Sequence, residues 1–152
     1  GILSKNDTTD SVIDAIAIGC YEDARKSVEA AKATLDVLSA RYPMVLVSNF
    51  YGNIQAVLDD FKLTSYFPVV IESAVVGVRK PDPAIFRLGV EALALQPEEV
   101  VVIGDSYRKD IQPAQSLGCD TIWIKGAGWD DSEAAVQHDK IITDIAQLQE
   151  LL

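Results

Sequence analysis

The sequence predicts a three-layer α/β/α domain built on a parallel sheet, and three observations support this. Short apolar runs alternate with longer segments of helical pattern along the 152 residues. These runs are continuous rather than alternating in polarity, which is typical of strands buried on both faces. Polar residues follow directly after several of the runs. In a parallel sheet such residues gather at the carboxyl edge, where ligands bind.

The first half of the chain is expected to begin with helical structure. Apolar residues spaced by three and four, from Val28 to Leu38, predict a helix over 21–41, and a shorter helical stretch is expected at 11–20. Pro43 ends the longer helix. The other elements expected here are a strand at 44–47, a helix at 52–61 and a strand at 69–71.

The second half continues the alternation. Asp82 suits an N-cap and Pro83 a first helical turn, so a helix is expected to run from there to about residue 94. Gly118 fits the position just after a helix at 109–117, with Pro113 in its first turn. The remaining expected elements are strands at 100–103 and 121–124, an extended piece at 141–142 and a closing helix at 145–152.

Composition excludes several classes of protein. Hydrophobic residues make up 49% of the chain, enough for a substantial core. The net charge of −10 argues against a nucleic-acid binder or a polybasic membrane-surface protein, because both need clustered Lys and Arg. No apolar run approaches the length of a membrane span. Cys20 and Cys119 are expected as free thiols in a cytoplasmic protein. Trp123 is expected in the core and Trp129 near the site.

Two places in the sequence could bind an anion. Ser48 and Asn49 follow a predicted strand, where a hydroxyl and exposed backbone N–H groups can hold a phosphate oxygen. The alternative is a simple turn, which both residue types favour. Lys80 precedes the prolines that open the next helix, and an ammonium beside a helix N-terminus is a natural anion site. The alternative is a solvated surface lysine.

Asp105 and Asp110 form a carboxylate pair after the strand at 100–103. Mg²⁺ takes one or two carboxylates together with waters and substrate phosphate. One acid could therefore ligate the metal while the other pairs with the lysine. The alternative is that Asp105 or Ser106 only caps the following helix. His138, the only histidine, is expected at the surface rather than in catalysis.

These motifs together resemble the haloacid dehalogenase-like (HAD) hydrolase superfamily. The resemblance covers about residues 20–152 and implies a Rossmann-like core. It rests on three segments in this order: Val47-Ser48-Asn49, Lys80-Pro81-Asp82-Pro83 and Gly104-Asp105-Ser106-x-x-x-Asp110.

The resemblance also implies a role for each of these residues. Ser48 would bind the transferring phosphoryl group and Lys80 would balance its charge. Asp105 would ligate Mg²⁺, and Asp110 would position Lys80 or support the metal site. Members that cleave carbon–halogen bonds typically lack the acid after the glycine, so Asp105 favours a phosphatase over a haloacid dehalogenase. The expected function is Mg²⁺-dependent hydrolysis of a small phosphorylated metabolite in the cytosol.

The chain departs from the family at its start. Family enzymes begin with a strand ending in Asp-x-Asp-x-Thr, whose first Asp is the nucleophile that forms an aspartyl-phosphate. The nearest segment here, at 7–10, has no apolar strand before it. Residues 1–20 are therefore interpreted as a residual cap or linker segment and 21–152 as the core domain. The chain by itself is expected to be inactive.

In the family the missing strand lies between the strands ending here at Ser48 and Ile103. Its absence would leave two inner strands with unpaired main chain. Three explanations stay open: truncation of a longer enzyme, a strand supplied by a second chain, or direct pairing of the remaining strands. Alternative functions are a non-catalytic phosphate- or partner-binding domain and, less favoured, a receiver-like signalling domain. The substrate and the oligomeric state are left open.

Overall fold

The computed structural model of the chain describes residues 7–126 and 136–152, so Trp129 lies outside the described residues. The chain divides into two compact units, Gly1–Ala33 and Thr34–Leu152. Helix α1 (Asp7–Ser39) is continuous where the sequence predicts two successive helical segments. The segment at 7–10, compared above with the nucleophile motif, belongs to this helix. No helix in the described part of the chain is long and apolar enough to cross a membrane.

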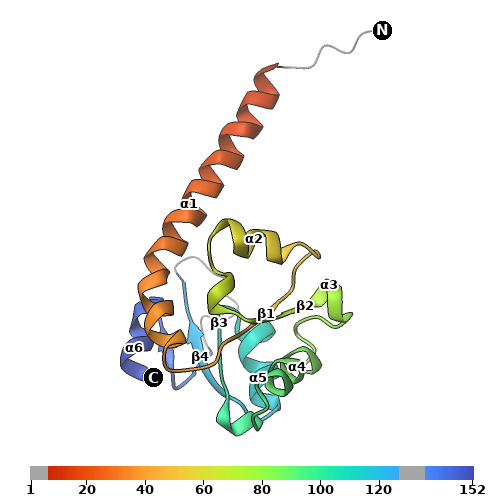
Figure 1. Cartoon of the computed structure of the whole chain (residues 1–152), viewed down its shortest axis with the longest axis vertical. Coiled ribbons are helices and arrows are strands. Elements are labelled where there is room, and N and C mark those ends of the chain that lie inside the picture. Colours follow the sequence, from red (N-terminus) through yellow and green to blue (C-terminus); the bar gives the residue numbers. More distant parts are fainter. Residues whose placement is uncertain (1–6, 127–135) are drawn as a thin grey trace. The chain divides into compact units, whose positions relative to one another are not determined.

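All strands in the described part of the chain lie in the second unit (Figure 1). After α1 the main elements are β1 (Val45–Ser48), α2 (Ile54–Asp60), β2 (Val69–Glu72), α3 (Ser73–Val76), α4 (Ala84–Leu93), β3 (Val101–Gly104), α5 (Gln112–Ser116), β4 (Asp120–Ile124), β5 (Ile141–Ile142) and α6 (Leu148–Leu151). A π-helical turn at Tyr107–Ile111 leads into α5. The predicted strands and helices are confirmed close to their expected bounds, and α3 is an addition to them.

The strands form two separate parallel sheets. β1 pairs with β2, and Ser48 lies opposite Glu72. β4 pairs with β3 on one side, where Gly104 lies opposite Trp123, and with β5 on the other. Within residues 7–126 and 136–152, no second strand pairs with β1 or with β3. The parallel α/β class is therefore confirmed, and direct pairing of β1 with β3 does not occur.

The two strands without a second partner remain partly open. Every residue of β1 and every residue of β3 is half-buried, whereas the three central residues of β4 are fully buried. A parallel strand inside a covered sheet is normally buried along its length. β1 and β3 are therefore less covered than their place in an α/β fold would require.

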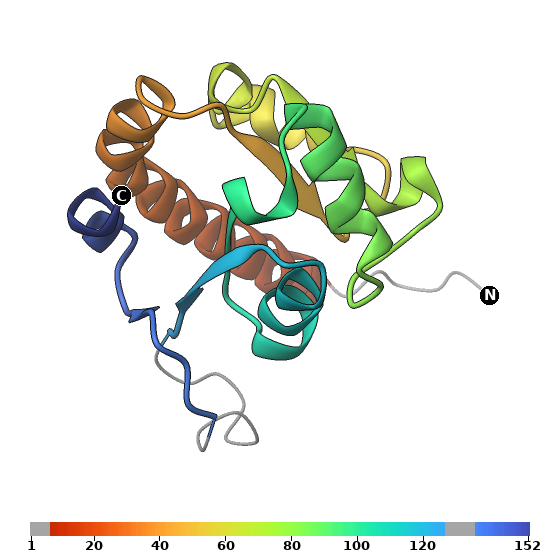
Figure 2. The same cartoon turned by 90° about the horizontal axis from the view of Figure 1, so that it is seen from below.

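Helices cover the strands on both faces. On one face Phe86 of α4 packs in a cluster that includes Val47 of β1 and Val102 of β3. On the other, Leu38 of α1 and Leu148 of α6 pack in a cluster with residues of all three strands of the second sheet. Figures 1 and 2 both show the end of α1 beside α6. Three layers result, as predicted, and Trp123 is buried as expected.

Candidate active site

An ion pair between Lys80 and Asp110 connects the loop after α3 with the turn after β3. Lys80 Nζ lies 2.6 Å from Asp110 Oδ1, and the two side chains are 18% and 5% exposed. The ring of Phe86 lies near the ammonium, with 5.8 Å between Nζ and the ring centroid. The structure thus brings together two residues that the sequence places thirty positions apart. The ion pair also links the two sheets at the carboxyl ends of their strands.

Asn49 ties the end of β1 to the same lysine. Its Nδ2 donates to the carbonyl oxygen of Lys80 at 3.0 Å, and its Oδ1 accepts from the Lys80 N–H at 2.8 Å. Both ends of the amide are therefore engaged by the lysine main chain. Ser48 directly precedes Asn49 and is half-buried. Ser48, Asn49, Lys80 and Asp110 consequently gather at one edge.

The turn after β3 is shaped around Asp110. The second carboxylate oxygen of Asp110 accepts from the Ser106 N–H at 3.1 Å. A Cβ on Gly104 would lie only 2.3 Å from the Cβ of Asp110, so a side chain at this position would collide with the acid. Ser106 Oγ accepts from the Lys109 N–H and caps the π-helical turn. The capping role considered for this segment therefore falls to Ser106.

Asp105 is the acid of the pair that points to solvent. It is exposed, and its carbonyl oxygen accepts from Trp123 Nε1 at 3.0 Å, which fixes the main chain at the strand end. Asp110, in contrast, is occupied by Lys80. Within the described residues no group of three or more His, Cys, Asp or Glu could hold a metal ion. One exposed carboxylate meets the lower limit for Mg²⁺, which completes its shell with waters and phosphate.

Glu72 and Ser73 also shape this edge, although the sequence analysis does not single them out. Glu72 is 6% exposed, and its carboxylate accepts from the Gly52 N–H. Ser73 Oγ accepts from the Phe50 N–H at 3.2 Å. Together they hold the loop that follows Asn49. The sequence signal that could have identified Glu72 is an acid directly after an apolar run, at the same edge as Ser48.

A cavity of about 380 Å³ adjoins this edge. Its walls come from the loop after β1, from the start of α3 and from the loop that leads to Lys80. The lining residues are Asn49, Phe50, Tyr51, Ser73, Ala74, Gly77, Val78 and Arg79. The cavity therefore meets the candidate site at Asn49 and at the residue before Lys80.

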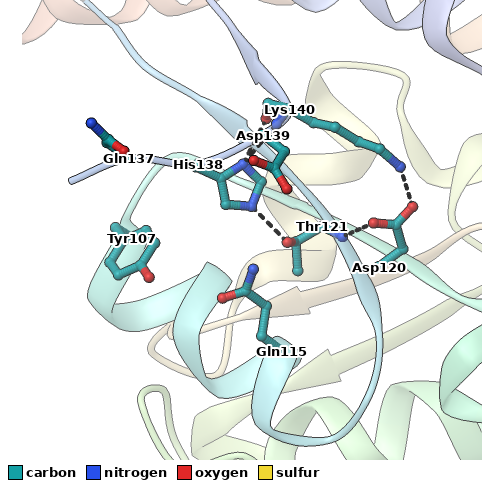
Figure 3. A pocket seen from close by; sticks show the side chains of 8 residues that line it. All are labelled: Tyr107, Gln115, Asp120, Thr121, Gln137, His138, Asp139 and Lys140. Carbon is teal, nitrogen blue, oxygen red and sulfur yellow. Dashed lines mark hydrogen bonds and ion pairs between the residues drawn. The ribbon is translucent and has the colours of Figure 1, made fainter.

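A second cavity, of about 190 Å³, contains none of the predicted site residues (Figure 3). His138 Nε2 lies 2.8 Å from Thr121 Oγ1, and His138 Nδ1 lies 3.0 Å from the carbonyl oxygen of Lys140. Lys140 also pairs with Asp120, and this hydrogen bond holds the pKa of the Asp120 carboxyl below its usual range. His138 is half-buried, and these neighbours hold its ring. The hydrogen bonds and the ion pair in this cavity therefore join its own polar groups to one another.

Comparison with known proteins agrees with this geometry. The chain matches the family model of the haloacid dehalogenase-like hydrolases over residues 3–118. It is 36% identical over 93 residues to a glyceraldehyde 3-phosphate phosphatase from Pyrococcus furiosus, which covers 60% of this chain and 39% of that protein.

Two solved structures share the fold. One is an HAD phosphatase from Thermococcus onnurineus, with a TM-score of 0.66 and 28% identity over 83% of this chain and 54% of that one. The other is a 2-haloacid dehalogenase from Pseudomonas syringae, with a TM-score of 0.66 and 26% identity over 78% and 50%. The chain thus spans about half the length of these proteins, or less. The family match includes the segments that carry Asn49, Lys80 and Asp110, and the chain belongs to the haloacid dehalogenase-like hydrolase family.

Proposed function

We propose that this chain carries the phosphate-binding part of a Mg²⁺-dependent phosphatase acting on a small phosphorylated metabolite. The observation that carries the proposal is the ion pair of Lys80 with Asp110, held beside the end of β1. A fixed ammonium at the ends of several strands suits a doubly charged anion. Similarity to a phosphatase of glyceraldehyde 3-phosphate supports a phosphomonoester as the ligand.

Each residue at this edge has a proposed role. The Ser48 hydroxyl holds a phosphate oxygen, and the Lys80 ammonium balances the charge. Asp110 positions the ammonium through its buried carboxylate. Asn49, proposed from the sequence to bind phosphate, contributes by holding the Lys80 main chain, because its side chain is already engaged there. Such preorganisation lowers the cost of orienting the substrate.

Asp105 is the residue that would hold Mg²⁺. It is exposed and stands at the end of β3, while Asp110 is committed to Lys80. A bound Mg²⁺ would neutralise charge on the phosphate during transfer.

The reaction also needs a nucleophile. Asp105 and Asp110 already have other roles, so we assign the nucleophile to an aspartate on an extended segment that pairs with β1 and β3. Two features support this: neither strand has a second partner in the described part of the chain, and both are half-buried. Unpaired main chain is costly when covered, so a strand placed there would stabilise both sheets. The aspartate would form an aspartyl-phosphate that water then hydrolyses.

A haloacid is the second candidate substrate, because one structural relative is a 2-haloacid dehalogenase. Lys80 could bind a carboxylate as well as a phosphate. The exposed Asp105 carboxylate favours the phosphatase, since without a cation it would repel an organic acid.

A binding and turnover experiment tests the proposal. Calorimetry should show inorganic phosphate binding in the presence of Mg²⁺, weakened about tenfold or more in Lys80→Met because a charge-assisted contact is lost. Lys26→Met, which removes an exposed lysine on α1, should bind normally. Absence of phosphate binding, or equal binding by Lys80→Met, would overturn the assignment.

Turnover is tested with glycerol 3-phosphate and Mg²⁺. The chain alone should release no phosphate. Addition of an apolar strand peptide ending in Asp-x-Asp should restore release, whereas a peptide with Asn in place of the first Asp should not. Robust turnover by the chain alone would contradict the assignment of the nucleophile to an added strand. Halide release from a 2-haloacid would favour the second candidate.

A further inference from the structure

Among the described residues, Arg79 is the only charged one that lines the cavity beside Asn49. It is exposed and forms no ion pair with the described residues. The other polar side chains of the wall are mostly engaged: Asn49 binds the Lys80 main chain, and Ser73 binds the main chain of Phe50. A lone cation in the wall of a cavity is noteworthy in a chain with a net charge of −10. Arg79 is therefore available to an anion from outside.

The main chain around Arg79 is fixed on both sides. The Arg79 carbonyl oxygen accepts from the Asp82 N–H at 3.0 Å, and the next N–H, of Lys80, is held by Asn49. Because the loop is tied at both points, the arginine leaves the chain at a defined place next to Lys80. Less ordering is then required when a ligand binds.

The rest of the wall suits the body of an organic molecule. Phe50 and the exposed Tyr51 line it, with their ring centroids 5.7 Å apart, and Ala74, Gly77 and Val78 add small or apolar surface. An aromatic and apolar wall with one guanidinium is matched by a short carbon chain ending in an anion. A guanidinium binds carboxylate or phosphate through two parallel hydrogen bonds.

We propose that this cavity binds a second anionic group of the substrate through Arg79. The inference rests on the proposed function, because the first anion is the phosphate held by Ser48 and Lys80. The substrate class is a phosphomonoester that carries a carboxylate or a second phosphate at the other end of a short carbon chain. Carboxylate and phosphate are both oxyanions, so either one could bind Arg79 as the second anionic group.

Paired probes test the inference on the full chain. 3-Phosphoglycerate and glycerol 3-phosphate differ by one carboxylate, and 1,3-propanediol bisphosphate carries a second phosphate instead. Calorimetry with Mg²⁺ should show 3-phosphoglycerate or the bisphosphate binding about tenfold more tightly than glycerol 3-phosphate. Whichever of the two binds more tightly identifies the second oxyanion. Arg79→Gln should remove this preference while glycerol 3-phosphate still binds. Arg87→Gln, an exposed arginine on α4, is the matched control and should keep the preference.

The outcomes separate the two proposals. If all three probes bind the wild type equally, or if Arg79→Gln keeps the preference, the second-anion site is wrong and the phosphate site stands. If neither inorganic phosphate nor any of the three probes binds, the proposed function fails and this inference fails with it.

Discussion

Lys80 Nζ and Asp110 Oδ1 lie 2.6 Å apart and join two sheets that share no hydrogen-bonded strand pair. Breaking a buried charge pair on one side leaves the other charge without compensation. We therefore expect Lys80→Met and Asp110→Asn each to lower the free energy of unfolding, by about 2–4 kcal/mol, somewhat less than for a fully buried pair because Lys80 keeps some exposure. Urea denaturation measures this effect. The double variant should lose clearly less than the sum of the two, and simple additivity would show that the pair is not coupled.

Position 104 requires a glycine because Asp110 packs directly against it. A Cβ added to Gly104 meets the Asp110 Cβ at 2.3 Å, and neither atom is the mobile end of a side chain. Gly104→Ala should therefore destabilise the protein by about 1–3 kcal/mol, as overpacking does. The matched control is Gly19→Ala on α1, where no described atom outside the helix's own backbone lies within 4 Å of an added Cβ. That change should stabilise the helix by roughly 0.5–1 kcal/mol. Thermal unfolding of both variants checks the prediction, and equal effects would contradict it.

Asn49 should act through the position of Lys80. Asn49→Ala removes two hydrogen bonds to the Lys80 main chain, and Asn49→Asp keeps an acceptor but loses the donor. Phosphate affinity should fall by about five- to tenfold in Asn49→Ala, given about 1 kcal/mol for a typical hydrogen bond. The Lys80 amide resonance in an NMR spectrum should shift in both variants before any phosphate is added. An unchanged Lys80 resonance together with lost affinity would indicate direct binding by the Asn49 side chain instead.

The two cysteines should differ sharply in reactivity. Cys119 is 6% exposed, and burial raises the pKa of its thiol. Cys20 is exposed. Because the thiolate is the reactive form, a maleimide reagent should label Cys20 quickly in the native protein and Cys119 only after unfolding. Mass spectrometry of the labelled peptides gives the result. Rapid native labelling of Cys119 would show that its packing on α5 is loose.

Lys140 should set part of the acid stability through Asp120. The folded-state pKa of Asp120 is lowered from its ordinary value of 3.8, mainly by the hydrogen bond from Lys140. The stability that the charged Asp120 contributes is therefore fully present above the ordinary pKa of 3.8 and is lost as pH falls through the lower folded-state pKa. Lys140→Met should cost about 0.2–1 kcal/mol at neutral pH, since the pair is half exposed. The difference from wild type should shrink as the pH is lowered through the acid range. A difference that does not change with pH would point to lost packing rather than charge.

The sequence is sufficient to predict the order of the elements because each depends on local signals. The apolar runs at 44–47 and 100–103 predict strands, which the structure places at 45–48 and 101–104, and Gly118 adopts the left-handed conformation expected just after a helix. The site residues are also predictable as a group, because parallel strands bring their carboxyl ends to one edge.

Other features of the site depend on contacts between distant residues. The engagement of Asn49 with the Lys80 main chain and the support of the loop by Glu72 both arise from tertiary packing, which a local pattern does not encode. The sequence likewise left open whether β1 and β3 pair with each other. In the structure they do not pair, and the two sheets are connected by apolar packing under α4 and by the Lys80–Asp110 ion pair.

The central claim is that Ser48, Lys80 and Asp105 act on one phosphate at one edge of the sheets. Amide NMR shift mapping with inorganic phosphate and Mg²⁺ tests it most directly. The account predicts that the resonances of 48–49, 80 and 105–106 shift together and saturate at one phosphate concentration, with Mg²⁺ adding to the shift at Asp105. Shifts confined to the cavity around Thr121 and His138, or different saturation at Lys80 and Asp105, would contradict it.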